Sequence, residues 1–339
     1  MTDVAVIAFA ESPRTRRDDS TTNGVEMLVP IFREAFDTTG LSKDNIDFWC
    51  SGSSDYLAGR AFSFVTAVDA IGAVPPMAES HVEMDGAWAL YEAWVKILSG
   101  EAETALVYGF GKSSAGMLRR VMALQLDPYL LAPLWPDSVS IAALQARLGI
   151  EAGLWSEKEM AAVAIRSRGL EASVEDLLDQ PYIADPLRKH DCASITDGAA
   201  VVILAAGDRA RELCERPAWI TGFEHRIDSQ HLGLRDLTIA PSATAAGRAA
   251  IAKGVDLAEL HAPFTHQELL LRTALGLGDS VAINPSGGVL PGNPMFAAGL
   301  ARIGSAAKEI IDGRAQRTLG HATSGPALQQ NLVCVMEGR

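Results

Sequence analysis

The chain has 339 residues, of which 48% are hydrophobic and 21% are charged. That apolar fraction is ample for a buried core and excludes disorder for most of the chain. The formal net charge of −13 argues against nucleic-acid binding, which needs a basic face. No apolar run reaches the roughly 18 residues that a spanning helix needs, so no membrane association is expected.

The four cysteines lie far apart, at Cys50, Cys192, Cys214 and Cys334. Because none belongs to a CxxC pair, no metal site is predicted, and reduced thiols of a cytoplasmic protein are the default. The N-terminal apolar run follows an acidic residue and lacks the basic segment of a signal peptide, so it is interpreted as a first strand.

Short apolar runs along the chain predict buried strands. They are Val4–Phe9, Ile46–Cys50, Thr104–Phe110, Val201–Ala205, Ala218–Phe223 and Leu332–Met336. Helical patterns lie between these runs. They are Val25–Phe36, Gly86–Leu98, Lys158–Arg168, Thr244–Lys253 and Phe296–Ile311. Strands that alternate with helices of this length predict an α/β fold with covered sheets.

Two pairs of segments indicate an internal duplication. Lys96–Ser114 and Lys308–Ser324 each read as a helix end, a glycine-led turn, a short strand and a Gly/Ser loop. Leu41–Gly52 and Ala252–Phe264 each follow a helix, carry Ile-Asp or Val-Asp at a strand start, and end in a polar loop. Chance similarity among βα turns is the alternative. Ser113–His190 interrupts the pattern and is interpreted as an inserted loop or cap that shapes a site.

A first candidate site is the segment HVEMDGAWAL, residues 81–90, at the head of a buried helix. Asp85 stands in the N-cap position and Gly86 in the first turn. A helix start offers free N–H groups and partial positive charge, which suits a nucleophile or an oxyanion. Gly86, however, has no side chain, and an ordinary capped helix is the structural alternative.

A second candidate is the glycine- and proline-rich segment Asn284–Pro294. Its paired glycines, Gly287 and Gly288, bring the backbone close to another strand or to a ligand. Asn293 precedes a proline at the mouth of a helix, where its amide could donate to a carbonyl. A simple connection between two elements is the alternative interpretation.

Three histidines lie in loops that follow predicted strands. His261 and His266 come after a strand end, where the sites of α/β proteins collect, but their spacing differs from the HExxH metal motif. Each can equally be a structural histidine. His321 lies in a loop of small residues with Ser324 and Gly325. A serine hydrolase is disfavoured because the chain has no GxSxG elbow.

The segment Asp191–Ala200 precedes a predicted core strand. Cys192 is a candidate thiol there, but spacing fixes no histidine beside it, so we interpret the segment as a packing turn.

In chain order, DCASITDGAAVV, INPSGG and HATSGPALQQN resemble loops of the thiolase superfamily, and of its sterol-carrier, lipid-transfer branch in particular. The resemblance covers most of the chain, from Val4 to Glu337.

The resemblance implies a fold and its boundaries. Thiolases have two similar βαβαβαββ halves separated by a loop domain, so we expect a five-layered αβαβα architecture with an inserted loop domain. The implied N-terminal half is 1–112, the inserted loop or cap region is 113–190, and the C-terminal half is 191–339.

The departures from the family pattern concern its catalytic residues. Aligning VEMDGAWAL places Gly86 where a thiolase has its nucleophilic cysteine. The activating histidine of the family falls on Asn293, its second cysteine on His321, and the polar residue of its third loop on His261. The acyl-enzyme route is therefore expected to be closed, because glycine provides no thiol.

The resemblance also implies roles for the remaining residues. His261 and Asn293 are expected to hold the thioester oxygen and its enolate, and His321 to act as acid/base with His266 as its substitute. A vacancy at Gly86 is expected to admit a branched substrate. Substrate or coenzyme A contacts are expected from Asp85, Gly86, Ser286, Gly287, Gly288, Ser324 and Gly325. A sterol-sized pocket, or simply the core of the insertion, is expected from Met117, Leu130, Leu131, Leu134 and Trp135.

The implied activity is retro-aldol cleavage of a β-hydroxyacyl-CoA, with a steroid side-chain thioester as the expected substrate. The expected products are a ketone and a shortened acyl-CoA such as propanoyl-CoA. Acyl transfer with an atypical site and a non-catalytic CoA-thioester-binding subunit are the alternatives. No tightly bound cofactor is expected, since coenzyme A belongs to the substrate. Expected partners are a second copy of the chain, a small OB-fold/zinc-ribbon protein and an enoyl-CoA hydratase.

Overall fold

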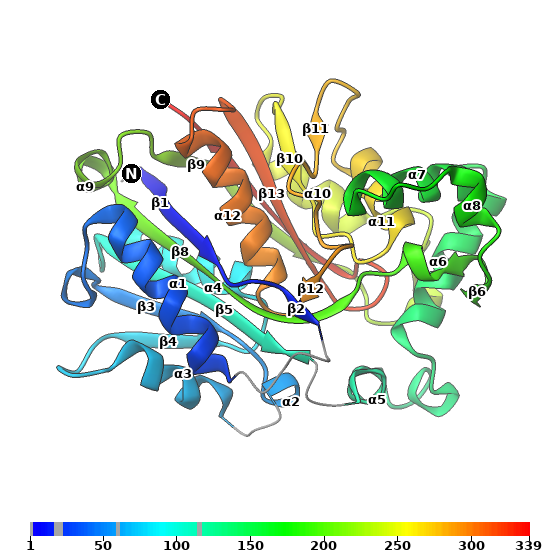
Figure 1. Ribbon diagram of the computed structural model, residues 1–339, viewed down its shortest axis with the longest axis horizontal. Coiled ribbons are helices and arrows are strands. Elements are labelled where there is room, and N and C mark those ends of the chain that lie inside the picture. The colour runs from blue at the N-terminus through cyan, green and yellow to red at the C-terminus, as the bar shows by residue number, and fades with distance from the viewer. Residues whose placement is uncertain (1–2, 17–22, 59–61, 114–116) are drawn as a thin grey trace.

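The structure is a computed structural model that describes residues 3–16, 23–58, 62–113 and 117–339 (Figure 1). Within these ranges a mixed sheet of twelve strands spans the molecule. Along its main path the strands are β11 (Ala282–Ile283), β10 (Leu257–Glu259), β13 (Arg317–Ser324), β14 (Gln330–Glu337), β9 (Ala218–Ile227), β1 (Val4–Glu11), β8 (Ile195–Ala206), β5 (Thr104–Lys112), β3 (Phe48–Gly52) and β4 (Glu79–Val82). Two short strands, β2 (Thr15–Arg16) and β12 (Asn293–Pro294), also pair with β8.

The sheet is built from two units with the same strand order. In the first unit the order is β1-β8-β5-β3-β4, and in the second it is β9-β14-β13-β10-β11. Each reads first, fifth, fourth, second and third strand in chain order, and the units meet where β1 pairs antiparallel with β9. The two sequence pairs fall on corresponding elements, so this topology agrees with the predicted duplication.

The strand pairing also locates the break between the two units. β8 begins after residue 190 but pairs with β1 and β5, so it is the fifth strand of the first unit. By this criterion the second unit starts at β9, later than the predicted boundary between 190 and 191. The cause is chain order: a first-unit strand follows the insertion, and sequence alone assigned it to the half beside it.

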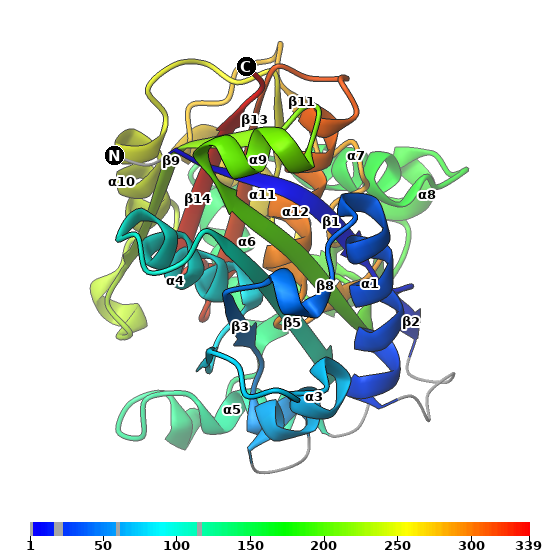
Figure 2. The same cartoon turned by 90° about the vertical axis from the view of Figure 1, so that its left-hand side faces the viewer.

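Helices cover both faces of each unit and give five layers. Between the units lie α4 (Gly86–Leu98) and α12 (Ala298–Ile311), whose apolar side chains share one core with strands of both (Figures 1 and 2). The outer face of the first unit carries α1 (Gly24–Thr39) and α3 (Ser63–Ile71). The outer face of the second carries α10 (Pro241–Ala250) and α11 (Thr265–Ala274). This arrangement is the predicted αβαβα architecture.

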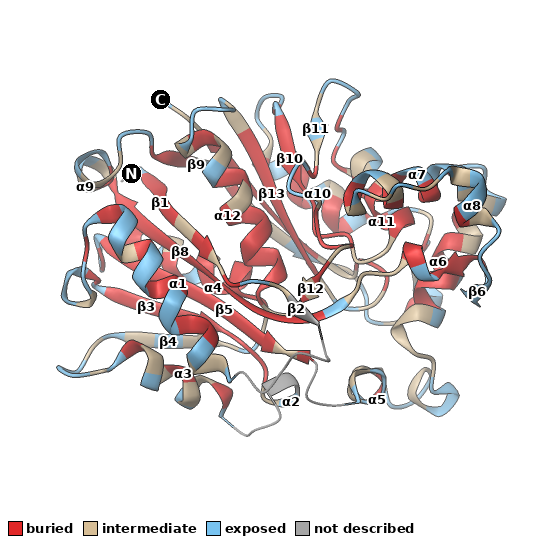
Figure 3. Ribbon diagram, in the orientation of Figure 1, coloured by how far each residue is buried: buried red, intermediate tan, exposed pale blue. Residues whose placement is uncertain are grey.

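More than half of each central helix is buried, with seven of the thirteen residues of α4 and ten of the fourteen of α12. Figure 3 shows α12 and the strands around it as mostly buried. Small residues allow this close packing: a Cβ added at Gly304 of α12 would come within 2.0 Å of the Phe9 ring on β1. The central layer therefore fixes the two helix N-termini against the sheet with little freedom.

The insertion is mainly helical in the part that the structure describes. Its elements are α5 (Leu118–Leu124), a 3-10 turn (Ala132–Leu134), α6 (Ser138–Glu151), α7 (Glu157–Arg168), α8 (Val174–Leu178), β6 (Tyr182–Ala184) and β7 (Leu187–Arg188). α6 joins the outer core of the second unit. Two short helices, α2 (Asp55–Ala58) and α9 (Gly207–Leu213), complete the set. None of the helices in the described ranges is long and apolar enough to cross a membrane.

Candidate active site

The candidate site centres on His261, which follows the end of β10. Its Nε2 lies 3.2 Å from Oδ1 of Asn293. The backbone N–H of Thr323, on β13, donates to its Nδ1 at 3.4 Å. Because Nδ1 accepts, the proton of the neutral ring stands on Nε2 and is donated to Asn293. The Asn293 amide group is thereby turned so that its Nδ2 hydrogens are left for another acceptor.

His321 is fully buried on β13, in the same part of the fold. Its Nε2 lies 3.0 Å from Oδ1 of Asn331. The Asn331 amide is itself fixed, since its Nδ2 donates to Ser242 Oγ at 2.8 Å and to the Leu328 carbonyl at 2.9 Å. Nε2 of His321 is therefore the donor, and Nδ1 keeps its lone pair without a partner in the described part of the chain. That lone pair is the one position of the ring that is left for a proton from a ligand.

Burial determines the charge of both histidines. It lowers the pKa of His261 to about 4, and the positive charge of Arg302 adds to this shift. It lowers the pKa of His321 to about 3, with a contribution from His261. Both rings are accordingly neutral near pH 7, and burial makes each of them a weaker base than a free imidazole.

Asp85 joins the N-termini of the two central helices. Its buried carboxylate accepts from the backbone N–H groups of Ala87 on α4 and of Gly299 and Leu300 on α12, each at 2.9 Å. Burial raises the pKa of this carboxyl, and the three backbone hydrogen bonds oppose the change. Asp85 was expected to contact substrate, but its oxygens are occupied by the helix caps, so its place in the fold is that of a positioning residue.

Gly86 is closely surrounded rather than vacant. A Cβ added there would lie 2.8 Å from Cδ2 of Leu300 and 3.1 Å from Cα of Gly109. Its N–H donates to the Phe296 carbonyl at 2.8 Å. The space that the sequence analysis assigned to a branched substrate is therefore filled by α12 and β5, and that expectation needs correction.

The segment after β11 is held by a buried network of polar side chains next to the site. Ser286 donates from its backbone N–H to Glu259 Oε1 at 3.0 Å and from its hydroxyl to Oε2 at 2.7 Å. Arg302 on α12 is fully buried and forms an ion pair of 2.7 Å with the same Glu259 Oε2. Ser286 was expected to contact coenzyme A, but its hydroxyl is engaged in this network.

The other three of the four expected glycines occupy turns. Gly287 and Gly288 both adopt positive φ angles, 89° and 66°, which glycine accepts without strain. The Gly288 carbonyl accepts from Arg14 Nη1 at 2.9 Å. Gly325 has a φ of 74° in the hairpin between β13 and β14, directly after Ser324.

His266 does not join the His261 cluster. It is fully buried on α11, where its Nε2 lies 3.2 Å from Oε1 of Gln145 on α6. Its ring centre is 6.0 Å from that of Trp155. These partners belong to the insertion, so His266 connects the insertion to the second unit. The expectation that it substitutes for His321 as acid/base receives no support from this position.

The apolar residues expected to line a pocket are mostly turned to solvent. Met117, Leu130, Leu134 and Trp135 are each at least half exposed. Leu131 instead packs against a small core around Ile141. In the described structure these residues form an exposed surface of the insertion rather than an enclosed cavity.

No reactive thiolate stands in the described part of the site. Burial raises the pKa of Cys50 and of Cys192 to about 12, and it raises the pKa of Cys334 as well. Burial also raises the pKa of Cys214. Among the described residues no group of three His, Cys, Asp or Glu side chains is arranged to hold a metal ion. The available chemistry is thus neutral histidine bases with an amide donor.

Sequence reasoning missed Thr323, Asn331 and Arg302, which hold the site residues in place. Thr323 lies 62 residues from His261, and Arg302 lies 43 residues from Glu259. Asn331 is only ten residues from His321, across the β13–β14 hairpin. The strand pattern around His321 is the one signal that could have pointed to Asn331, since residues of a hairpin pair across strands.

Comparison with known structures identifies the fold of the chain. No family model matches the chain. The human mitochondrial 3-ketoacyl-CoA thiolase aligns over 100% of this chain and 99% of its own, with a TM-score of 0.80 and 17% identity. The structure titled Ltp2-ChsH2(DUF35) aldolase aligns over 99% of this chain and 98% of that chain, with a TM-score of 0.79 and 17% identity. The protein therefore has the thiolase fold.

Sequence relatives point to the same superfamily. The acetyl-CoA acetyltransferase of Methanothermobacter thermautotrophicus is 29% identical over 177 residues, 42% of this chain and 46% of that protein. The acetyl-CoA acetyltransferase of Methanocaldococcus jannaschii is 24% identical over 90% of this chain and 88% of that protein. The 17-hydroxy-3-oxo-4-pregnene-20-carboxyl-CoA lyase of Mycobacterium tuberculosis is 40% identical over 52 residues, 15% of this chain and 14% of that protein. The chain is thus a thiolase-fold protein. Its match to the first of these relatives spans less than half of that protein's length.

Proposed function

We propose that the protein is a carbon–carbon lyase that cleaves a β-hydroxyacyl-CoA by a retro-aldol reaction. The observation that carries the proposal is the pairing of neutral, buried histidines with an amide donor where no ionisable thiol stands. Claisen cleavage needs a thiolate to accept the acyl group, whereas retro-aldol cleavage needs only a base and oxyanion donors. The similarity to a steroid CoA lyase and to an aldolase structure supports the same choice.

In the proposed reaction, His321 Nδ1 takes the proton of the β-hydroxyl group. The O–H electron pair forms the new C=O bond, the Cα–Cβ bond breaks, and its electrons pass to the thioester as an enolate. Asn293 Nδ2, oriented by His261, donates to the enolate oxygen, and such a donor is worth about 3 kcal/mol. The histidinium at 321 then returns its proton to Cα. The products are a ketone and a shortened acyl-CoA.

The proposed substrate is a steroid side-chain CoA thioester, and propanoyl-CoA is the proposed short product. Coenzyme A enters as part of the substrate, and no tightly bound cofactor takes part in the proposal. Proposed partners are a second copy of this chain, a small OB-fold/zinc-ribbon protein and an enoyl-CoA hydratase. The similarity to the Ltp2-ChsH2(DUF35) aldolase supports a partner, since that structure pairs Ltp2 with a DUF35 protein. The proposed location is the cytoplasm.

Acyl transfer is the second candidate function. It is favoured by the similarity to two archaeal acetyl-CoA acetyltransferases. It would require a thiol or another nucleophile beyond the described site, from a partner subunit for example. A non-catalytic CoA-thioester-binding subunit is the third possibility.

One experiment distinguishes the three functions. The protein is incubated with a β-hydroxy steroid acyl-CoA, with and without the OB-fold partner, and the products are followed by mass spectrometry. Release of a ketone and a shortened acyl-CoA without added free coenzyme A supports the lyase. Strict dependence on free coenzyme A as acyl acceptor overturns it, and lack of turnover under every condition supports the binding subunit.

The site assignment predicts which variants lose activity. His321→Gln and Asn293→Ala are expected to lower kcat at least about 10²-fold, because one removes the base and the other an oxyanion donor. His266→Gln is the matched control, since glutamine can keep the hydrogen bond to Gln145 and the residue lies outside the cluster. Equal rates for His321→Gln and His266→Gln would reject His321 as the base.

A further inference from the structure

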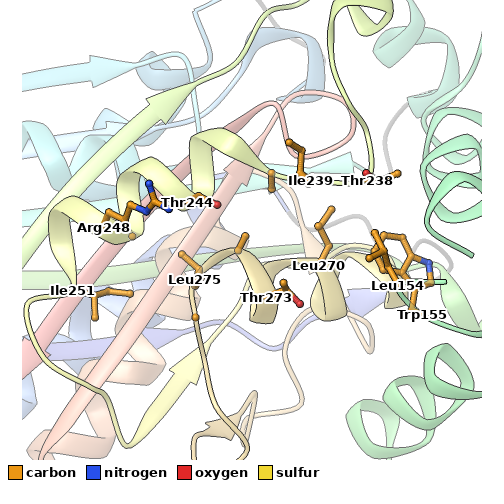
Figure 4. A pocket seen from close by; sticks show the side chains of 14 residues that line it. Leu154, Trp155, Thr238, Ile239, Thr244, Arg248, Ile251, Leu270, Thr273 and Leu275 are labelled. Carbon is orange, nitrogen blue, oxygen red and sulfur yellow. The ribbon is translucent and has the colours of Figure 1, made fainter. Parts of the chain in front are cut away.

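A hollow lies on the outer side of the second unit, away from the His261 cluster. It has a volume of about 520 Å³, and it lies between α10, α11 and the turn that joins α6 to α7 (Figure 4). This size is in the range of small-molecule sites. The residues that line it do not include any residue of the candidate active site. Its lining is mainly apolar, with Leu154, Trp155, Ile239, Leu270 and Leu275 as the large members.

Small residues create the hollow. Ala240, Gly247, Ala274 and Gly276 line it where larger side chains would fill it. At Gly247 an added Cβ would lie 2.8 Å from Cδ2 of Leu275, so α10 and α11 approach closely beneath the floor. The small size of these residues therefore leaves the space that forms the hollow.

The rim combines apolar side chains with one cation. Leu154 is 54% exposed and Ile239 is 50% exposed, although both border the hollow. Arg248 lies one helical turn after Thr244 on α10, so both side chains stand on the same side of that helix, and Figure 4 displays them next to each other. In the part of the chain that the structure describes, Arg248 has no hydrogen bond or ion pair.

Arg248 is exposed to solvent, so its guanidinium group can reach a ligand at the rim. A guanidinium beside a hydroxyl group forms charge-assisted hydrogen bonds with a carboxylate. The apolar walls exclude water from the remainder of the ligand. A ligand with one anionic head and one apolar body therefore matches the two parts of the lining, the polar rim and the apolar walls.

We propose that this hollow binds an unesterified carboxylate with an apolar body. The carboxylate contacts Arg248 and Thr244, and the apolar body lies along Leu275 and Leu270 toward Trp155. A linear fatty acid and a rigid steroid carboxylate share this chemistry. The proposal does not rest on the lyase activity, since it concerns binding at a separate place.

Isothermal titration calorimetry with the purified full chain tests the proposal. The probes are decanoate and cholanoate as the two sources of a carboxylate, and decanol as the uncharged control. At least one acid is expected to bind more tightly than decanol. Which acid binds distinguishes the linear ligand from the rigid one. Absence of binding by both acids, or equal affinity for decanoate and decanol where decanoate is the acid bound, would overturn the proposal.

Two variants locate the binding. Arg248→Gln is expected to weaken acid binding about tenfold and to leave decanol binding unchanged, because it removes one charge-assisted contact. Thr273→Phe fills the hollow from an exposed position on α11 and is expected to abolish binding of every probe. Arg209→Gln, on α9, is the matched control and should bind as the wild type does. Circular dichroism establishes that each variant is folded, and wild-type affinity in both Arg248→Gln and Thr273→Phe would contradict the site.

Discussion

The neutral state of three buried histidines has a consequence for stability. Burial lowers the pKa of His261 to about 4 and those of His266 and His321 to about 3, whereas an unperturbed histidine has a pKa near 6.5. Below that value the unfolded chain binds protons that the folded chain does not. The stability that depends on these neutral histidines is therefore fully present above about pH 6.5. It is lost as the pH falls toward the pKa values of the folded state.

His266 allows this effect to be measured apart from the site. His266→Gln removes one proton-binding group that differs between the folded and unfolded states and can keep the bond to Gln145. We expect the free energy of unfolding to fall with decreasing pH less steeply in the variant, by up to about 1.4 kcal/mol per pH unit between pH 6 and 4. Urea unfolding at several pH values measures the two slopes.

The matched control for this measurement is His225→Gln, a partly exposed position on β9. If His266→Gln and the wild type gave parallel lines across the acid range, the assignment of His266 as a neutral buried histidine would be wrong.

At the scale of elements, α4, α12 and β5 meet at Gly86. A Cβ at this position lies 3.1 Å from the Leu300 Cβ and 2.8 Å from its Cδ2. Gly86→Ala is expected to destabilise the fold by about 1–3 kcal/mol, because the added methyl group overpacks a rigid junction. The same argument makes a cysteine at 86 a poor route to a thiolase.

Leu300→Ala supplies the control for this prediction. Alone it is expected to cost about 2–5 kcal/mol, because it leaves a cavity at a buried leucine. The double variant with Gly86→Ala should be destabilised by less than the sum of the two single variants, since the new methyl group enters the vacated space. Urea unfolding of the four proteins measures the coupling, and simple additivity would contradict the packing described here.

The sequence predicted elements best where local signals agree. The helix expected at Gly86–Leu98 is α4 with the same bounds, because its apolar run begins directly after a capping aspartate. β10 and β11 have three and two residues. Such strands are defined by their neighbours in the sheet, which no local pattern contains.

The arrangement of the candidate site could be anticipated only where a motif suggested it. His261 and Asn293 were expected together from the family resemblance. In the structure His261 Nε2 lies 3.2 Å from Asn293 Oδ1. His266 was misplaced because only four residues separate it from His261, although the chain enters α11 between them. Its actual partner, Gln145, is 121 residues away, a contact that only the tertiary fold provides.

At the scale of the whole molecule, the two repeated units leave a sheet with two ends. One end is β11, with two residues, and the other is β4, with four. An open edge strand presents unpaired backbone groups to another chain. Near β4, large apolar side chains are exposed, namely Phe62, Val65 and Val74. This combination favours the β4 end as the contact between two copies.

We therefore expect a dimer of twice 36.0 kDa in which the β4 edges and the α3 helices of two copies face each other. Val65→Glu, on α3, should shift the protein to the monomer, because two buried carboxylates would face each other without partners. Val95→Glu, at an exposed position on α4, is the control and should remain dimeric. Light scattering coupled to size exclusion measures the mass. A monomeric wild type would contradict the expectation, and so would a dimer that Val95→Glu dissociates and Val65→Glu does not.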